Sequence, residues 1–344
     1  MINSYQNKKA LLVGNGVNLL DSSQSFSWGA LLDELKREYS IDVDLDNVFK
    51  PFPLAFDEML HQKPGINEFN RKIRTLKQRI RSSIDFQLEG KTGYNEYHQK
   101  IASLPYNDVL TTNYDYSLQK SFSNDFFSKK IKIATNRKES KFSLKRGYMF
   151  PGKIFWHIHG ELYDSRTLSQ HSKYYNEESI MIGYAHYTSY LERIQESIKG
   201  KSGSQEVENQ SLLVRLRDEV TSPFWTDIFF THNLDIIGQG FDFSENHLWW
   251  LINFRANTIR KRNPKQQVKI NNRIRFFYPR INGRDQIELN NVNIDEIVTK
   301  QNSVHKNKAI AEVLKAFKVE PIQIKADTYK EFYNIFIERI KNES

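Results

Sequence analysis

The chain has 344 residues, of which 50 are Lys or Arg and 41 are Asp or Glu, and 39% are hydrophobic. At about 150 residues per domain, this length predicts one large or two modest domains. The chain has no cysteine, which excludes a disulfide framework, a cysteine-ligated zinc ribbon, an iron–sulfur cluster and a thiol nucleophile. No stretch approaches the ~20 apolar residues of a membrane span, and the polar start lacks a signal peptide's apolar run. We therefore expect a soluble, cytoplasmic protein that does not enter a membrane.

The net charge of +9 suggests an anionic partner, but the excess is spread thinly along the chain. The densest basic runs are Arg71–Arg81 and Arg260–Arg275. In the first run, apolar residues recur at three- and four-residue spacing, at Phe69, Ile73, Leu76, Ile80 and Ile84. This spacing predicts an amphipathic helix with a solvated basic face. A patch that binds nucleic acid is the less favoured alternative.

Short apolar runs alternate with longer helical patterns, which is typical of an α/β fold with a mainly parallel sheet. The candidate strands are Ala10–Val13, Val109–Thr112, Ile154–Ile158, Leu234–Gly238, Ile274–Tyr278 and Val319–Ile324. The clearest helices are Trp28–Glu38, Ile66–Leu88, Tyr184–Ile198, Glu245–Phe254, Lys306–Phe317 and Thr328–Lys341. A simple crossover between parallel strands needs far fewer residues than the chain supplies at about 19–105 and 163–223. These two segments are predicted to be helical insertions.

A glycine turn, Gly14-Asn15-Gly16-Val17-Asn18, follows the first candidate strand. Such a turn lets the backbone approach a phosphate, which exposed N–H groups can then hold. The third glycine of the usual dinucleotide motif is missing, because Leu19 stands in its place. A tight strand-to-helix turn without a ligand explains this pattern equally well.

Polar residues follow the second candidate strand in the run Thr111-Thr112-Asn113-Tyr114-Asp115. Open α/β sheets bind ligands at the carboxyl ends of their strands, so Asn113 and Asp115 are candidates for binding. Thr, Asn and Asp also cap helices well. We expect one of them to cap, but capping does not need all three.

Two histidines close the third candidate strand, in Trp156-His157-Ile158-His159-Gly160. The two-residue period of a strand places His157 and His159 on the same side, with His159 at the strand end. A histidine pair can bind a metal, but no third ligand has a suitable spacing, so we expect no metal. We expect His159 and Asn113, each at a strand end, to face solvent-filled space. A structural histidine is the common alternative to a catalytic one.

A second glycine turn, Gly238-Gln239-Gly240-Phe241, follows the fourth candidate strand and precedes a predicted helix. It could contact another part of the same nucleotide as the first turn. Trp249 and Trp250 in that helix are expected to lie in the core or in an interface.

In chain order, these four motifs resemble those of the SIR2-like family, which has a sirtuin-type Rossmann fold. The run GNGVN at 14–18 is similar to the family's GAG(I/V)S turn, with Asn15 for alanine and Asn18 for serine. TTNYD at 111–115 resembles (T/Q)(T/Q)N(I/Y)D, and HIHG at 157–160 resembles the catalytic His-Gly. IIGQGF at 236–241 resembles the late ribose-binding loop. The likeness covers about 10–20, 108–118, 153–162 and 234–250.

The resemblance implies one Rossmann-like domain over 1–344 whose parallel sheet carries the two helical insertions. Sirtuin deacylases have a four-cysteine zinc ribbon, and its absence here argues against protein deacylation. The closest likeness is to bacterial antiphage-defence members, which cleave NAD to nicotinamide and ADP-ribose. The abortive-infection family AbiH shares the opening turn and the late strand, and it is a close rival.

By this resemblance, NAD is the substrate, and His159 and Asn113 are catalytic. His159 would be the general base, since an imidazole has an ordinary pKa near ~6.5. Asn113 would hold the nicotinamide ribose or the attacking water, and Asp115 would contact the carboxamide of nicotinamide. The turn at Gly14–Asn18 would bind the pyrophosphate. The remaining nucleotide-binding candidates are Thr111, Gly238, Gly240 and Phe241.

Two other functions remain open at this point. One is a catalytically silent sensor of NAD or ADP-ribose, and the other is a nucleic-acid-binding effector whose affinity falls with salt. A constitutive NAD hydrolase would be toxic, so we expect a gate, with a defence-system protein as a possible partner. The insertions carry large side chains at Trp28, Phe52, Phe56, Tyr187 and Tyr190, which favour a homo-oligomer.

Overall fold

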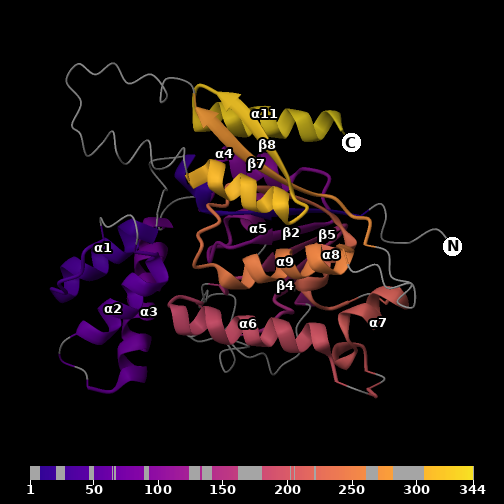
Figure 1. Ribbon diagram of the computed structural model, residues 1–344. Coiled ribbons are helices and arrows are strands. Elements are labelled where there is room, and N and C mark those ends of the chain that lie inside the picture. Colours follow the sequence, from indigo (N-terminus) through magenta and orange to yellow (C-terminus); the bar gives the residue numbers. More distant parts are fainter. Residues whose placement is uncertain are drawn as a thin grey trace.

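The computed structural model of the chain shows one sheet with helices packed around it (Figure 1). The described residues are 8–20, 28–45, 50–63, 65, 67–88, 93–123, 132–133, 142–161, 180–201, 203–204, 206–220, 222–260, 270–281 and 306–343.

The described strands form one eight-stranded sheet in the order β3-β4-β5-β2-β1-β6-β7-β8. Strands β5, β2, β1, β6, β7 and β8 pair in parallel with their neighbours. Numbered along the chain, these parallel strands have the order 3-2-1-4-5-6, which is typical of dinucleotide-binding Rossmann folds. The predicted α/β, Rossmann-like fold is therefore confirmed, and its topological switch point lies between β1 and β6.

All six candidate strands are present within one or two residues of their predicted bounds, except that β7 extends three residues further. Their bounds are β1 Lys9–Val13, β2 Asp108–Thr111, β5 Lys153–His157, β6 Asn233–Ile237, β7 Ile274–Ile281 and β8 Glu320–Ala326. The sequence analysis missed β3 (Lys132–Ile133) and β4 (Gly147–Phe150), which form an antiparallel extension at the β5 edge. β3 has only two residues, and β4 has four but begins with a glycine, so neither stands out as an apolar run.

Helices cover both faces of the sheet (Figure 1). Alternate residues of a strand point to opposite faces, so each central strand contributes apolar side chains to two cores. Leu11 and Val13 of β1 face one core, whereas Ala10 and Leu12 face the other. The first core contains residues of η1 (Asn15–Leu20), α1 (Trp28–Tyr39), α2 (Phe52–Gln62), α3 (Phe69–Leu88), α4 (Glu96–Ala102), α5 (Ser117–Phe122) and α11 (Tyr329–Asn342). The second contains residues of α6 (Tyr184–Lys199), α7 (Leu212–Arg217), α8 (Ile228–Thr231), α9 (Asn246–Arg260) and a helix at 306–316.

The amphipathic pattern of α3 is confirmed where its side chains are described. Leu76, Ile80 and Ile84 are buried and belong to the first core. Arg79 instead pairs with Glu34 of α1 at 2.7 Å, and it also contacts Glu38. At least one basic side chain of the run at 71–81 therefore links α3 to α1.

The two glycine turns pack directly on each other at the switch point. Gly14 N–H donates to Ile237 O at 2.9 Å, and Gly16 N–H donates to Gly238 O at 3.0 Å. A Cβ on Gly14 would lie 2.6 Å from Gln239 Cα, and one on Gly16 would lie 3.0 Å from Gly238 Cα. Close approach of two backbones therefore explains the glycines, whether or not a phosphate binds beside them.

Gly238 is the most constrained of these glycines. Its φ is +66°, in the left-handed region that disfavours side chains. A Cβ there would also collide with the Tyr333 hydroxyl of α11. That hydroxyl is buried and has no hydrogen-bond partner among the described residues.

We predict that Gly238→Ala lowers the free energy of unfolding by about 3 kcal/mol, through backbone strain and overpacking. Gly240→Ala is the matched control, since no described atom lies within 4 Å of the added methyl group. Its expected effect is within about 0.5 kcal/mol. Urea unfolding curves measure both changes. Equal stabilities of the two variants would contradict this account of the switch point.

Candidate functional site

The four sequence motifs lie along one edge of the sheet, at the carboxyl ends of β1, β2, β5 and β6. Asn113 Nδ2 lies 3.5 Å from Gly14 O, and the Thr112 hydroxyl donates to Gln239 Oε1 at 3.2 Å. Gln239 Nε2 donates to Glu245 Oε2 at 2.7 Å, and Glu245 Oε1 lies 4.0 Å from His159 Nε2. A connected set of polar side chains therefore joins the ends of β2 and β5 through the segment after β6.

Asn113 occupies the position expected for a ligand-binding amide. Its backbone N–H donates to Thr111 Oγ1 at 3.0 Å, which fixes the turn after β2. The side-chain Oδ1 is buried and has no hydrogen-bond partner among the described residues. A buried amide oxygen without a partner is costly. A hydroxyl or water that donates to it would remove that cost.

Asp115 belongs to a chain of hydrogen bonds that joins the first two motifs. Its Oδ2 accepts from Asn18 Nδ2 at 3.0 Å, and its Oδ1 accepts from Ser117 N at the start of α5 at 2.9 Å. Asn18 Oδ1 lies 2.8 Å from His98 Nε2, and His98 Nδ1 lies 3.1 Å from Asn95 N. Because Asn95 N donates to Nδ1, His98 donates through Nε2. Asp115 is thus engaged on both oxygens, and its predicted contact with nicotinamide stays a prediction.

His157 is enclosed by protein groups on every side. Its Nδ1 lies 3.0 Å from Asn113 O, which can only accept, so Nδ1 carries the proton. Its Nε2 then accepts from Gln119 Nε2 at 2.7 Å. The rings of Tyr116 and Tyr148 lie 5.3 and 5.8 Å from it. Burial lowers the pKa of His157 to about 4, so this histidine is neutral and serves to position the Asn113 backbone.

His159 lies beside a second histidine that the sequence analysis did not single out. Its Nε2 is 2.9 Å from His247 Nε2, so one ring donates and the other accepts. The ring of Tyr187 stacks on His247 at 5.0 Å and lies 5.4 Å from His159. Burial lowers the pKa of His159 to about 3, and burial also lowers that of His247. Both imidazoles are therefore neutral at pH 7.

Glu245 is the acidic member of this cluster and lies just before α9. Burial, together with the negative charge of Asp242, raises its pKa to about 8. Its carboxyl group is therefore mostly protonated at pH 7. Burial thus raises the pKa of Glu245 and lowers that of His159, so both neighbouring groups favour their uncharged forms.

The catalytic candidates are more enclosed than expected. The sequence analysis placed Asn113 and His159 beside solvent-filled space, yet they are only 6% and 2% exposed. That expectation was wrong, because His247 and Tyr187 cover His159, and Tyr114 donates a hydrogen bond to Met181 O next to the same strand end. The stability of any variant at this site must therefore be measured beside its activity.

The nucleotide candidates of the second turn have different surroundings. Gly240 is exposed, whereas the ring of Phe241 is buried in the second core against Trp249 and Phe276. Only the backbone of Phe241 is thus available to a nucleotide. Thr111 donates to Val13 O at 3.1 Å and joins β1 to β2.

Four site residues were missed from sequence: Gln239, Glu245, His247 and Tyr187. The first three lie in one segment that starts at the second glycine turn, and the polar run Ser244-Glu245-Asn246-His247 was the available signal. Tyr187 was noted only as a large side chain of the second insertion. Its role depends on how α6 packs on α9, which no local pattern reports.

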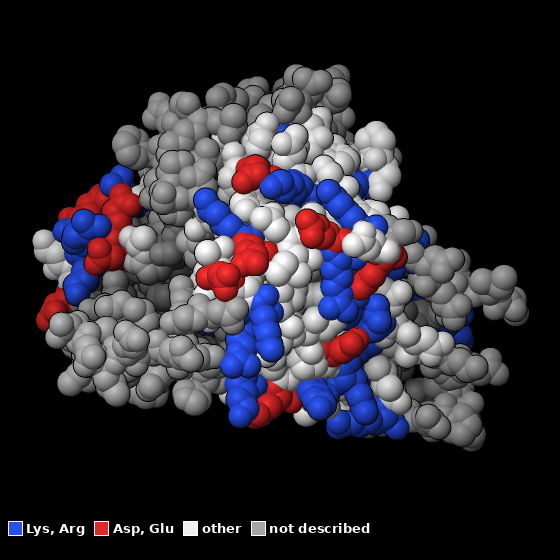
Figure 2. Space-filling view, turned by 90° about the horizontal axis from the view of Figure 1, so that it is seen from above, with Lys and Arg blue, Asp and Glu red and all other residues white. Residues whose placement is uncertain are grey.

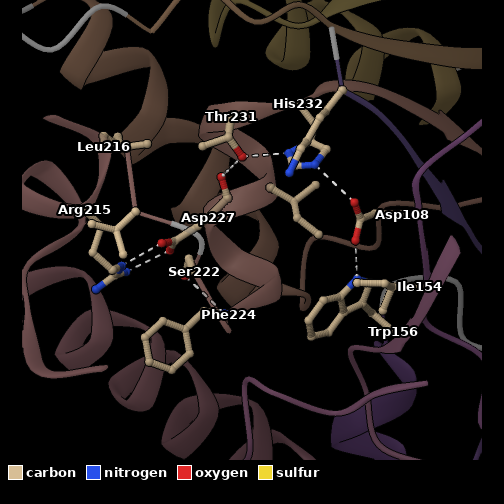
Figure 3. Close-up of a pocket in the computed structure, with 13 residues that line it drawn as sticks. Asp108, Ile154, Trp156, Arg215, Leu216, Ser222, Phe224, Asp227, Thr231 and His232 are labelled. Atoms are coloured by element: carbon tan, nitrogen blue, oxygen red, sulfur yellow. Dashed lines mark hydrogen bonds and ion pairs between the residues drawn. The ribbon is translucent and has the colours of Figure 1, made fainter. Parts of the chain in front are cut away.

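A separate pocket lies at the opposite, amino edge of the sheet (Figure 3). Figure 3 shows His232 between Thr231 and Asp108, with contacts of 2.7 Å to Thr231 Oγ1 and 3.1 Å to Asp108 Oδ2. Arg215 forms two hydrogen bonds with Asp227, at 2.7 and 2.8 Å. Several polar groups that line this pocket thus pair with one another. None of the site residues predicted from sequence lines it.

Three further expectations concern metal, membrane and nucleic acid. Within the described ranges, no three His, Asp or Glu side chains are grouped so that they could hold a metal ion. The described helices include none whose length and apolar character would let it cross a membrane. On the face seen from above in Figure 2, Lys and Arg are interspersed with Asp and Glu. In the basic run of α3, Arg71 and Arg74 are exposed, as a solvated face requires, whereas Lys77 is buried.

No known family model matches this chain, and no curated protein matches it.

We predict that His157→Ala lowers the free energy of unfolding by about 3 kcal/mol, because it removes a buried ring and leaves Gln119 and Asn113 O without a partner. His61→Ala, at an exposed histidine of α2, should change it by less than about 0.5 kcal/mol. Urea unfolding measures both. A His157→Ala protein as stable as the parent would contradict the structural role of this histidine.

Proposed function

We propose that this protein is an NAD glycohydrolase that cleaves NAD to nicotinamide and ADP-ribose. The supporting observation is that the four motifs that resemble those of SIR2-like proteins lie along one edge of a sheet with the dinucleotide-binding strand order. Open α/β sheets bind ligands at this switch point. The SIR2-like resemblance itself rests on the motifs alone.

The reaction needs an oriented ribose, a water molecule and a site that excludes further water. Asn113 Oδ1, which has no partner among the described residues, would accept a hydrogen bond from a ribose hydroxyl. His159 would contact the water that attacks C1′ of the ribose. The glycine turn at 14–18 would lie against the pyrophosphate. NAD is thus the substrate, and no metal takes part in this proposal.

We predict that the purified chain converts NAD to equal amounts of nicotinamide and ADP-ribose, measured by chromatography. The NAD content of cells that express the chain is measured in parallel, so that a cellular activator is present in one arm. Because an abortive-infection effector would starve its own cell of NAD, the cellular content should fall.

His159→Gln and Asn113→Ala should each lower the cleavage rate at least ~100-fold, since both remove a contact to the reacting groups. His61→Gln, at an exposed site, should leave the rate unchanged. Urea unfolding confirms that each variant is folded. If NAD binds the purified chain but is cleaved neither by that chain nor in expressing cells, a silent sensor would be favoured. Full activity of folded His159→Gln would remove this histidine from the mechanism.

We also propose that the chain self-associates through α2 and the start of α6. Of the large side chains expected at an interface, Phe56, Tyr187 and Tyr190 are buried within the chain itself. The side chain of Trp28 lies outside the described residues. The exposed apolar side chains at this place are Phe52 and Leu54 of α2 and Tyr184 of α6. The two helices are joined there by a 2.8 Å hydrogen bond from Tyr184 N to Asp57 Oδ2.

The expected result is a species larger than the 40.7 kDa monomer in sedimentation at micromolar concentration. Leu54→Glu should return the chain to a monomer, because a charge in an apolar interface is costly. Met149→Glu, at an exposed apolar residue of β4, is the control. A monomer under all conditions, with and without NAD, would refute self-association.

A further inference from the structure

We propose that Glu245 takes the proton of the attacking water, and that His159 orients this water as a neutral hydrogen-bonding partner. This inference rests on the proposed NAD glycohydrolase function and assigns its base. It differs from the expectation that His159 alone performs this step.

The geometry gives Glu245 one occupied and one available oxygen. Oε2 accepts the hydrogen bond from Gln239, which holds the carboxyl group in place. Oε1 accepts no hydrogen bond from the described residues and lies 4.0 Å from His159 Nε2. The side chain is 13% exposed, compared with 3% for that of His159. Glu245 is therefore the more accessible of the two.

Charge also favours the carboxylate as the proton acceptor. A proton on His159 would create a positive charge in a fully enclosed place beside His247, and burial lowers the pKa of both rings. A proton on Glu245 instead neutralises a charge, so the same burial favours it. The enclosed site thus opposes an imidazolium and accepts a carboxylic acid.

The groups near Glu245 among the described residues come from several elements. Gln239 and Asp242 belong to the turn before α9, His159 follows β5, and His247 lies within α9. Tyr187 of α6 and Tyr114 after β2 are near enough for the charge of Glu245 to raise their pKa values. Lys306 pairs with Asp242 at 3.3 Å. The charge of Asp242 raises the pKa of Glu245, and that of Lys306 lowers it.

The nicotinamide ring of NAD is positively charged, so its entry favours the ionised form of Glu245. The bond between C1′ and the ring nitrogen then breaks, and its electron pair neutralises the ring. The water oxygen bonds to C1′, and the water proton moves to Glu245 Oε1. Glu245 later releases this proton to solvent. Binding of the cationic substrate thereby favours the form of Glu245 that can accept a proton.

The first test is Glu245→Gln, which keeps an acceptor for Gln239 but cannot take a proton. The value of kcat should fall at least ~100-fold with little change in KM. Glu338→Gln, at an exposed position of α11, is the matched control and should keep the wild-type kcat. Urea unfolding shows whether each variant is folded.

The second test is the pH profile of kcat/KM, which reports groups of the free enzyme. The wild-type value should rise with pH and level off above a pKa near 8. Asp242→Asn should move this midpoint to lower pH, and Lys306→Met should move it to higher pH. If Glu245 had only a structural role, Asp242→Asn and Lys306→Met would not shift the midpoint of the kcat/KM profile in opposite directions.

The outcomes separate this inference from the function on which it rests. Wild-type kcat in folded Glu245→Gln, or a midpoint that neither charge variant moves, overturns the role of Glu245 and leaves NAD hydrolysis standing. No NAD cleavage by the wild-type chain, either purified or in cells, overturns both.

Discussion

The contact between the two glycine turns determines the geometry of the whole carboxyl edge. Backbone hydrogen bonds from Gly14 and Gly16 to β6 and its turn hold the ends of β1 and β6 at the distance of a backbone contact. A side chain on Gly14 or Gly16 would push the turns apart. Such a displacement would move Gln239 and Glu245 away from Thr112 and His159, because all of these contacts cross the same junction. The candidate site thus depends on a constraint that involves no catalytic side chain.

Four buried histidines and Glu245 lie around this junction and are mostly uncharged at pH 7. His98, His157, His159 and His247 are neutral because burial lowers their pKa values. Glu245 is mostly protonated at pH 7 because burial raises its pKa. Hydrogen bonds between neutral groups avoid the large cost of an unpaired buried charge. The enclosed histidines and Glu245 therefore need no counter-ion.

The sequence predicted the central part of the fold because each parallel strand is a short apolar run with a turn signal beside it. The ends of β1, β2, β5 and β6 could be placed together because parallel strands direct their carboxyl ends to one edge. It did not predict that His247 would face His159, since this contact joins residues 88 positions apart on different elements. It also did not predict the burial of His159, which depends on Tyr187 of an insertion. The ordinary pKa of an imidazole was therefore a poor guide to its state here.

The short segment from Gly238 to His247 combines the structural and chemical parts of the site. It begins at the glycine that contacts Gly14 and ends at the histidine that contacts His159. Between them, Gln239 bonds to both Thr112 and Glu245, and Asp242 O accepts from the indole of Trp249 at 3.1 Å. A small movement of α9 against β6 would therefore change several of these contacts together. Any protein or second copy that displaced α9 or the neighbouring α6 would act on His159 and Glu245 at once. Control of the site through α6 and α9 thus needs no contact with the reacting groups themselves.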